Sequence, residues 1–208
     1  MKQLLSIASA LLLACAVIPA HADSVTYTVT VNTSSQTGHG GYVDFELNAG
    51  SLGAQDITAT VTGFSGAVLN PGDPMNDAIG TTGSLPGPVT FDNQAGNDYF
   101  EALTFGSQLN FLVTLSGDGV STSGASTSDS GTIFQVSFWD PSGSAALFSS
   151  DPNGIAGEID VAADGTLTTG SQDGTTVSAA ATPEPATLSL VGAAGVLMYV
   201  AQRRRRAA

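Results

Sequence analysis

Hydrophobic and polar residues alternate strictly where the central region of the chain begins. Apolar residues occupy positions 25, 27, 29 and 31, and threonines occupy positions 26, 28 and 30. Successive side chains of a β-strand point to opposite faces of a sheet, so a period of two indicates a strand with one buried face. Residues 25–31 are therefore predicted to form a half-buried strand.

The same alternation recurs as far as residue 161. Val43, Phe45 and Leu47, for example, alternate with Asp44 and Glu46. Strand-like runs cover 25–31, 43–47, 57–62, 89–91, 99–105, 109–115, 132–139, 146–148 and 155–161. No stretch between 23 and 181 keeps a helical period, and the many Thr, Ser and Gly residues disfavour helix interiors. The pattern predicts an all-β fold, an antiparallel β-sandwich of jelly-roll-like character.

Loops and linkers follow from runs of small and polar residues. Segments 66–97 and 121–131 are predicted to be surface loops, and Asp-Gly or Asn-Gly pairs at 118–119, 153–154, 164–165 and 173–174 are predicted to be turns. The sandwich is expected to occupy 23–167, and residues 168–182 are expected to be a flexible linker.

The first 22 residues have the three parts of a secretory signal peptide. Lys2 begins the segment, an apolar run covers 4–18, and the small residues Ala20 and Ala22 precede Asp23. Signal peptidase is expected to cut between Ala22 and Asp23. A lipidated Cys15 is the alternative, but the residues after it remain apolar through Ile18, which favours the signal peptide.

The other end of the chain combines a proline motif, an apolar run and a basic cluster. Pro183, Glu184 and Pro185 precede the uncharged segment 186–202, which reaches the lower end of the about 17–25 residues that a membrane-spanning helix needs. Four arginines follow it: Arg203, Arg204, Arg205 and Arg206. Such a cluster stays on the cytoplasmic side of a membrane, so the central domain is expected to lie outside.

These C-terminal residues resemble the sorting signal of PEP-CTERM proteins of Gram-negative bacteria. The resemblance covers residues 182–208 and depends on Pro183, Glu184 and Pro185. It implies that an exosortase, a membrane-embedded cysteine protease or transpeptidase, cuts near the motif and releases or re-attaches the domain. The protein would be anchored transiently in the inner membrane and then reside at the cell surface or outside the cell.

The central region also resembles, more loosely, a β-rich domain that recurs on PEP-CTERM proteins. The similar segments are 41–45, 97–100 and 103–106. No characterised activity comes with this resemblance, although the family context implies a role in biofilm or exopolysaccharide.

Charge separates the central region from the two ends. Lys2 and Arg203–Arg206 are all five basic residues, whereas all eighteen acidic residues lie between them. A surface without cations repels phosphate backbones, so a nucleic-acid partner is excluded. The single cysteine, Cys15, falls in the leader, so the exported part has neither a disulfide nor a thiol nucleophile.

Few residues of the exported part are suited to catalysis. His39 is its only histidine, and its glycine-rich surroundings at 38–41 are typical of a polar turn. Two carboxylates facing each other, as in a glycoside hydrolase, remain compatible with the sequence, but nothing singles out a pair. The chain is predicted to be no enzyme and to need no cofactor.

Calcium is the one cofactor that the composition leaves open, because hard cations take carboxylate and carbonyl oxygens. Two loops carry several such side chains. The first contains Asp92, Asn97 and Asp98, and the second contains Asp151, Asn153 and Glu158. Neither follows the EF-hand order, and solvated turn residues are the simpler interpretation.

Trp139 is the candidate for contact with a sugar. It packs in the core or at an edge, or it projects outward, opposite Phe134, Val136 and Phe138, as a stacking platform; the first placement is the simpler. The sequence therefore predicts an exported, exosortase-processed matrix protein that acts through its fold. A carbohydrate- or calcium-binding module is the alternative, and a secreted glycoside hydrolase is a weaker one.

Overall fold

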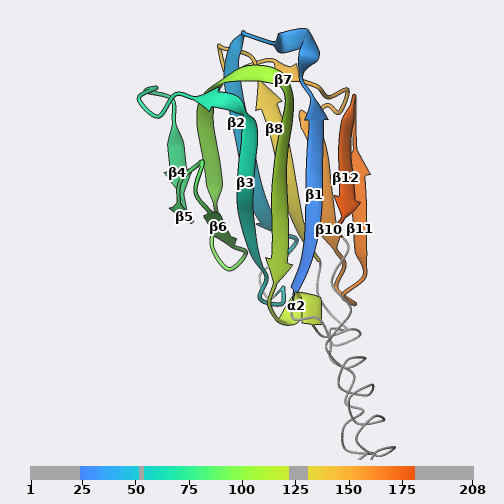
Figure 1. Cartoon of the computed structure of the whole chain (residues 1–208). Coiled ribbons are helices and arrows are strands. Elements are labelled where there is room, and N and C mark those ends of the chain that lie inside the picture. Colours follow the sequence, from blue (N-terminus) through green and yellow to red (C-terminus); the bar gives the residue numbers. More distant parts are fainter. Residues whose placement is uncertain (1–23, 52–53, 122–130, 181–208) are drawn as a thin grey trace, which may run out of the picture. The chain divides into compact units, whose positions relative to one another are not determined.

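The computed structural model describes residues 24–51, 54–121 and 131–180. These residues belong to one compact unit, Asp23–Ala181, and they form an antiparallel, almost entirely β structure (Figure 1). The signal peptide at 1–22, Cys15 within it, and the sorting signal at 183–208 lie outside the described residues.

Twelve strands are present in the described part of the chain. They are β1 (Ser24–Asn32), β2 (Gly40–Ala49), β3 (Thr58–Leu69), β4 (Asp77–Ile79), β5 (Thr81–Gly83), β6 (Val89–Asp92), β7 (Asp98–Ser116), β8 (Thr132–Trp139), β9 (Ala146–Leu147), β10 (Ile155–Val161), β11 (Leu167–Ser171) and β12 (Thr175–Ala179). A 3-10 turn, η1 (Ser34–Gln36), and a single helical turn, α2 (Asp118–Ser121), complete the elements.

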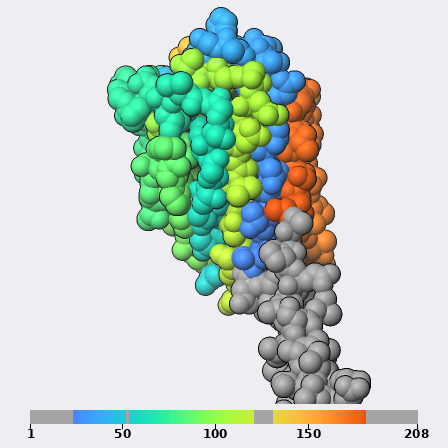
Figure 2. Space-filling view, in the orientation of Figure 1, coloured from blue at the N-terminus to red at the C-terminus, as the bar shows by residue number. Residues whose placement is uncertain are grey.

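The long strand β7 joins two layers of strands. Its first half pairs with β2, β4 and the end of β3, and its second half pairs with β1 and the rest of β3. One layer thus contains β4, β7, β2, β8, β9, β10 and β11, and the other contains β12, β1, β7, β3, β6 and β5. In Figure 1, β2 and β8 pass behind β3, β7 and β1. Figure 2 shows β3, β7, β1 and β12 packed side by side along the near face.

The core lies between these layers and is rich in phenylalanine. The Phe45 ring of β2 lies 5.2 Å from the Phe111 ring of β7, 6.4 Å from the Phe91 ring of β6 and 6.0 Å from the Phe134 ring of β8. Phe45, Phe91 and Phe134 are all fully buried. The alternation read from the sequence therefore places the apolar face of each layer inward. The predicted all-β, antiparallel, sandwich-like fold is confirmed, with all strands in one hydrogen-bonded sheet, and its jelly-roll-like character stays a prediction.

The expected linker at 168–182 is wrong over residues 168–179, which form most of β11 and all of β12. β11 pairs with β10, and β12 pairs with β1. The Asp-Gly turn at 173–174, where Asp173 and Gly174 both have positive φ, folds β12 back alongside β11. Both strands lie at the margin of the sheet with most of their side chains exposed, which fits their high content of Thr and Ser.

Two further elements differ from expectation. The segments 99–105 and 109–115, predicted as two strands, are one 19-residue strand, β7. The segment 66–97, predicted as loop apart from 89–91, contains the end of β3 and the short strands β4 and β5. Of the predicted loop at 121–131, residues 122–130 lie outside the described ones. Within the described ranges no helix is long and apolar enough to cross a membrane.

Candidate functional site

A polar surface covers the outside of the layer that contains β2 and β8. Along β8, Phe134, Val136 and Phe138 are buried in the core, so Gln135, Ser137 and Trp139 point the other way. β2 pairs antiparallel with β8, with Asp44 opposite Ser137 and Glu46 opposite Gln135. Partners in an antiparallel pair share a face of the sheet, so these polar side chains and Trp139 form one surface.

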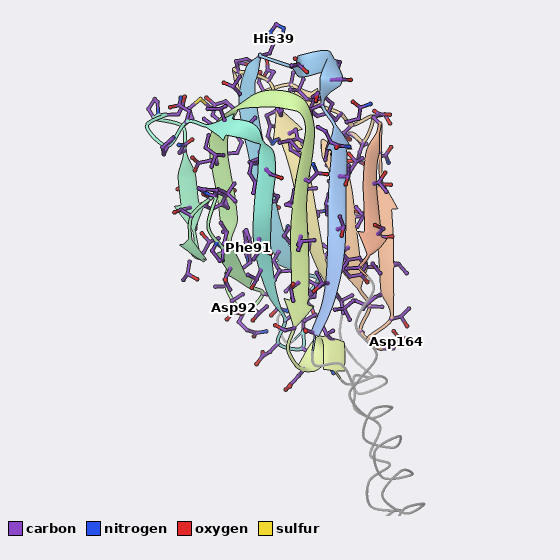
Figure 3. All side chains as sticks on the ribbon, viewed as in Figure 1. His39, Phe91, Asp92 and Asp164 are labelled. Atoms are coloured by element: carbon purple, nitrogen blue, oxygen red, sulfur yellow. The ribbon has the colours of Figure 1, made fainter. Side chains whose placement is uncertain are left out.

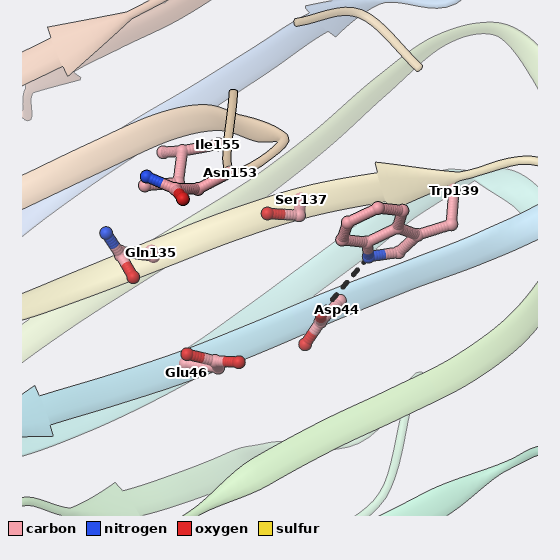
Figure 4. Close-up of a pocket in the computed structure, with 7 residues that line it drawn as sticks. All are labelled: Asp44, Glu46, Gln135, Ser137, Trp139, Asn153 and Ile155. Atoms are coloured by element: carbon pink, nitrogen blue, oxygen red, sulfur yellow. Dashed lines mark hydrogen bonds between the residues drawn. The ribbon is translucent and has the colours of Figure 1, made fainter. Parts of the chain in front are cut away.

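This surface is hollowed into a groove between β2, β8 and the turn before β10. The groove encloses about 270 Å³, close to the lower end of the about 300–1,000 Å³ of small-molecule sites, so it has room for one unit of a larger ligand. Figure 4 shows the side chains around it. They are Asp44, Glu46, Gln135, Ser137, Trp139, Asn153 and Ile155.

Two contacts fix the Trp139 indole at one end of the groove. Its Nε1 donates a hydrogen bond to Oδ2 of Asp44 at 3.1 Å, the dashed line of Figure 4. Gly154, at φ 81°, packs against the indole, and a Cβ there would lie 2.9 Å from Cη2 of Trp139. The ring is thus held by a hydrogen bond at its edge and by a glycine turn, which leaves it oriented before any ligand arrives.

The other end of the groove is held by an amide and a carboxylate. Nδ2 of Asn48 donates to Oε2 of Glu46 at 2.6 Å and to Oε1 of Gln135 at 3.5 Å. The carboxylate of Glu46 therefore has a preferred position, with further acceptor capacity left.

Asp44 also belongs to a carboxyl pair with Asp98, the first residue of β7. Oδ1 of Asp44 and Oδ1 of Asp98 are both buried, and neither has a hydrogen-bond donor among the described residues. Burial, and after it the charge of Asp98, raises the pKa of Asp44 to about 7. Burial likewise raises the pKa of Asp98, to which the charges of Glu46 and Asp77 also contribute. The paired carboxyls therefore hold a proton more readily than ordinary aspartates.

The groove combines hydrogen-bonding oxygens and amides with one aromatic wall. Its side chains supply two carboxyl groups, two amides, a hydroxyl and an indole, and no Lys or Arg exists between residues 3 and 202. Such a surface accepts hydrogen bonds from hydroxyl or ammonium groups and packs an apolar ring face against tryptophan.

Comparisons with known proteins add nothing to this geometry. The chain matches no family model, no curated protein and no solved structure.

In the first predicted calcium loop, the three side chains make separate contacts. Asn97 is buried, and its side chain bonds both backbone groups of Leu47, accepting from N at 2.7 Å and donating to O at 2.8 Å. Asp92 caps its own turn through the backbone N of Gln94 at 2.8 Å, and Asp98 lies beside Asp44. Asn97 thus has a structural role.

The second predicted loop is divided between two surfaces. Asp151 accepts from the backbone N of Asn153 at 2.8 Å and, together with Glu158, lines a smaller hollow of about 60 Å³ beside β11. The side chain of Asn153 lines the Trp139 groove instead. In residues 24–51, 54–121 and 131–180 no three His, Cys, Asp or Glu side chains are placed to hold a metal.

His39 is exposed in the turn between η1 and β2, at the end of the sandwich opposite Asp92 and Asp164 (Figure 3). It is not among the residues that line the groove. Ala20, Ala22, Asp23, the sorting motif and Arg203–Arg206 lie outside the described residues.

Trp139 was a candidate from the sequence, but packing in the core or at an edge was the simpler expectation; the structure instead places the half-buried indole on the outer face, where it lines the groove. The carboxylates and amides of the groove were missed. The alternation at 43–47 did place Asp44 and Glu46 on the outer face. The alternation could not show the pairing of β2 with β8, whose residues lie about ninety positions apart in the chain and whose contact brings these carboxylates beside Trp139.

Proposed function

We propose that this chain is an exported, non-catalytic saccharide-binding protein of the bacterial cell surface or extracellular matrix. The observation that carries the proposal is the preformed groove in which the Trp139 indole stands beside Asp44, Glu46 and Gln135. A pyranose ring has one apolar face for an aromatic side chain and a rim of hydroxyls for carboxylates and amides.

The two ends of the chain support the location in this proposal. A signal peptide at 1–22 would export the chain, and a membrane segment at 186–202 flanked by Arg203–Arg206 would hold it in the inner membrane. An exosortase acting at Pro183–Pro185 would then release or re-attach the domain, which would associate with exopolysaccharide in a biofilm.

The test uses the only tryptophan of the chain as its reporter. Because Trp139 is the sole tryptophan, its fluorescence emission reports on the groove alone when the full-length chain is titrated with oligosaccharides in detergent. We expect saturable changes with at least one saccharide class, and we expect Trp139→Ala to lower affinity about tenfold or more, measured by calorimetry.

Leu112→Ala is the matched control. Leu112 is 38% exposed on the second half of β7, in the other layer, so its loss should leave affinity unchanged. If no saccharide binds, or if Trp139→Ala binds as well as the native chain, the proposal is wrong. Release of new reducing ends from the bound sugar would show that the protein is a glycoside hydrolase instead.

A further inference from the structure

The groove has an excess of negative charge that nothing in the fold balances. Asp44 and Glu46 line it directly. The register of β2 with β7, extended one pair beyond Phe45 and Tyr99, places Asp98 next to Glu46 on the same face. With no Lys or Arg between residues 3 and 202, these carboxyls have no cationic side chain to pair with.

The hydrogen bonds of this group are incomplete as well. The indole N–H satisfies Oδ2 of Asp44, whereas Oδ1 of Asp44 and Oδ1 of Asp98 are buried and out of reach of a ligand. Glu46 accepts from Nδ2 of Asn48 and lines the groove with further acceptor capacity, so a ligand with charged N–H donors would form a strong hydrogen bond there.

The aromatic wall favours the same kind of ligand. A cation near the face of an indole is attracted by the negative charge of the ring face, and tryptophan is the strongest of the aromatic side chains in this respect. An anionic sugar, in contrast, would meet the carboxylate of Glu46 with like charge and find no cationic side chain beside it.

We propose that the groove selects saccharide units that carry a free amino group, as in a deacetylated hexosamine polymer. The ammonium would lie against Glu46 while the sugar ring packs on Trp139. This inference rests on the proposed saccharide-binding function and narrows its ligand to a cationic amino sugar; uronic acids and sulfated sugars are rejected.

The experiment compares three oligomers of equal length on the full-length chain in mildly acidic buffer: glucosamine, N-acetylglucosamine and glucose. We expect the glucosamine oligomer to bind about tenfold or more tightly than the other two, because a hydrogen bond between charged groups is roughly twice as strong as one between neutral groups. Glu46→Gln keeps the shape of the side chain and should abolish most of this preference.

The experiment must distinguish binding in the groove from general attraction to the acidic surface, since the whole domain is acidic. Asp164→Asn removes one carboxylate from the exposed turn between β10 and β11 and should leave the preference intact. Equal binding of all three oligomers would overturn the amino-sugar inference and leave saccharide binding standing. Equal losses in Glu46→Gln and Asp164→Asn would also overturn it. Absence of binding to every oligomer would remove both proposals.

Discussion

Asp44 lies between two partners of opposite character, the indole N–H of Trp139 and the carboxyl of Asp98. The first stabilises the ionised form of Asp44, whereas burial and the second partner stabilise the protonated form. Because the pKa of Asp44 rises to about 7, burial and repulsion outweigh the hydrogen bond. The groove therefore changes its charge near neutral pH.

This shift makes stability depend on pH in a defined direction. The pKa of Asp44 lies near 3.8 in an unfolded chain and near 7 in the folded one, so the folded state holds the additional proton between these values. The free energy of unfolding should then fall as pH rises from about 4 to about 7. Asp44→Asn, which cannot ionise, should flatten this fall and raise the melting temperature at neutral pH by several degrees.

Thermal unfolding from pH 4 to pH 8, followed by circular dichroism, measures this effect. Asp164→Asn again serves as a control, because Asp164 is exposed and hydrogen bonds donated by Thr166 lower its pKa. Asp164→Asn removes one carboxyl group, as Asp44→Asn does, but leaves the buried, proton-binding Asp44 in place. A flattening of equal size in both variants would mean that the net charge, and not Asp44, causes the pH dependence.

Among the elements, β7 determines how the two layers meet. Near its middle it passes from the layer of β2 to the layer of β1, and the register of its pairing with β3 shifts between Thr62 and Ala67 at this point. Gly66 and Gly106 lie against each other there: a Cβ on Gly106 would collide with the carbonyl oxygen of Gly66. Both strands thus need glycine where they cross the edge of the sandwich.

Gly106→Ala should therefore destabilise the domain, since the clashing atom is backbone and cannot move as a side chain would. We expect a loss of about 1–3 kcal/mol in the free energy of unfolding, the usual cost of overpacking, from urea denaturation. Gly72→Ala is the matched control, because a Cβ on Gly72 meets nothing within 4 Å. Equal stability of the two variants would contradict this role for β7.

The period-two alternation was enough to predict the strands that bury one face, because burial is what produces the alternation. It could not predict β4 and β12, whose side chains are largely exposed and whose pairing depends on distant strands. The alternation also predicted two strands on either side of Gly106, because it is interrupted there, although β7 continues through this position as one strand. The groove was missed for a related reason, since cross-strand neighbours are set by topology rather than by local sequence.

At the scale of the whole molecule, the separation of charge connects location with binding. All basic residues lie in the two segments proposed to direct export and membrane insertion, and all acidic residues lie between them. Once both segments are removed, the remaining protein would be purely acidic. A cationic amino polymer would then be attracted to the whole acidic surface, but it would be bound specifically only in the groove. Added salt should weaken the electrostatic attraction to the exposed surface before it weakens binding in the groove.

The mass of the mature protein tests the proposed processing. We expect protein recovered from the surface and medium of its native host to begin at Asp23 and to end near Pro185, because signal peptidase and an exosortase would remove both ends. Trypsin provides the control: with Lys2 and Arg203–Arg206 gone, no tryptic site remains, so the intact mass should be unchanged after digestion. A mass that includes Arg206 and shortens with trypsin would identify a permanently membrane-anchored domain and rule out exosortase release.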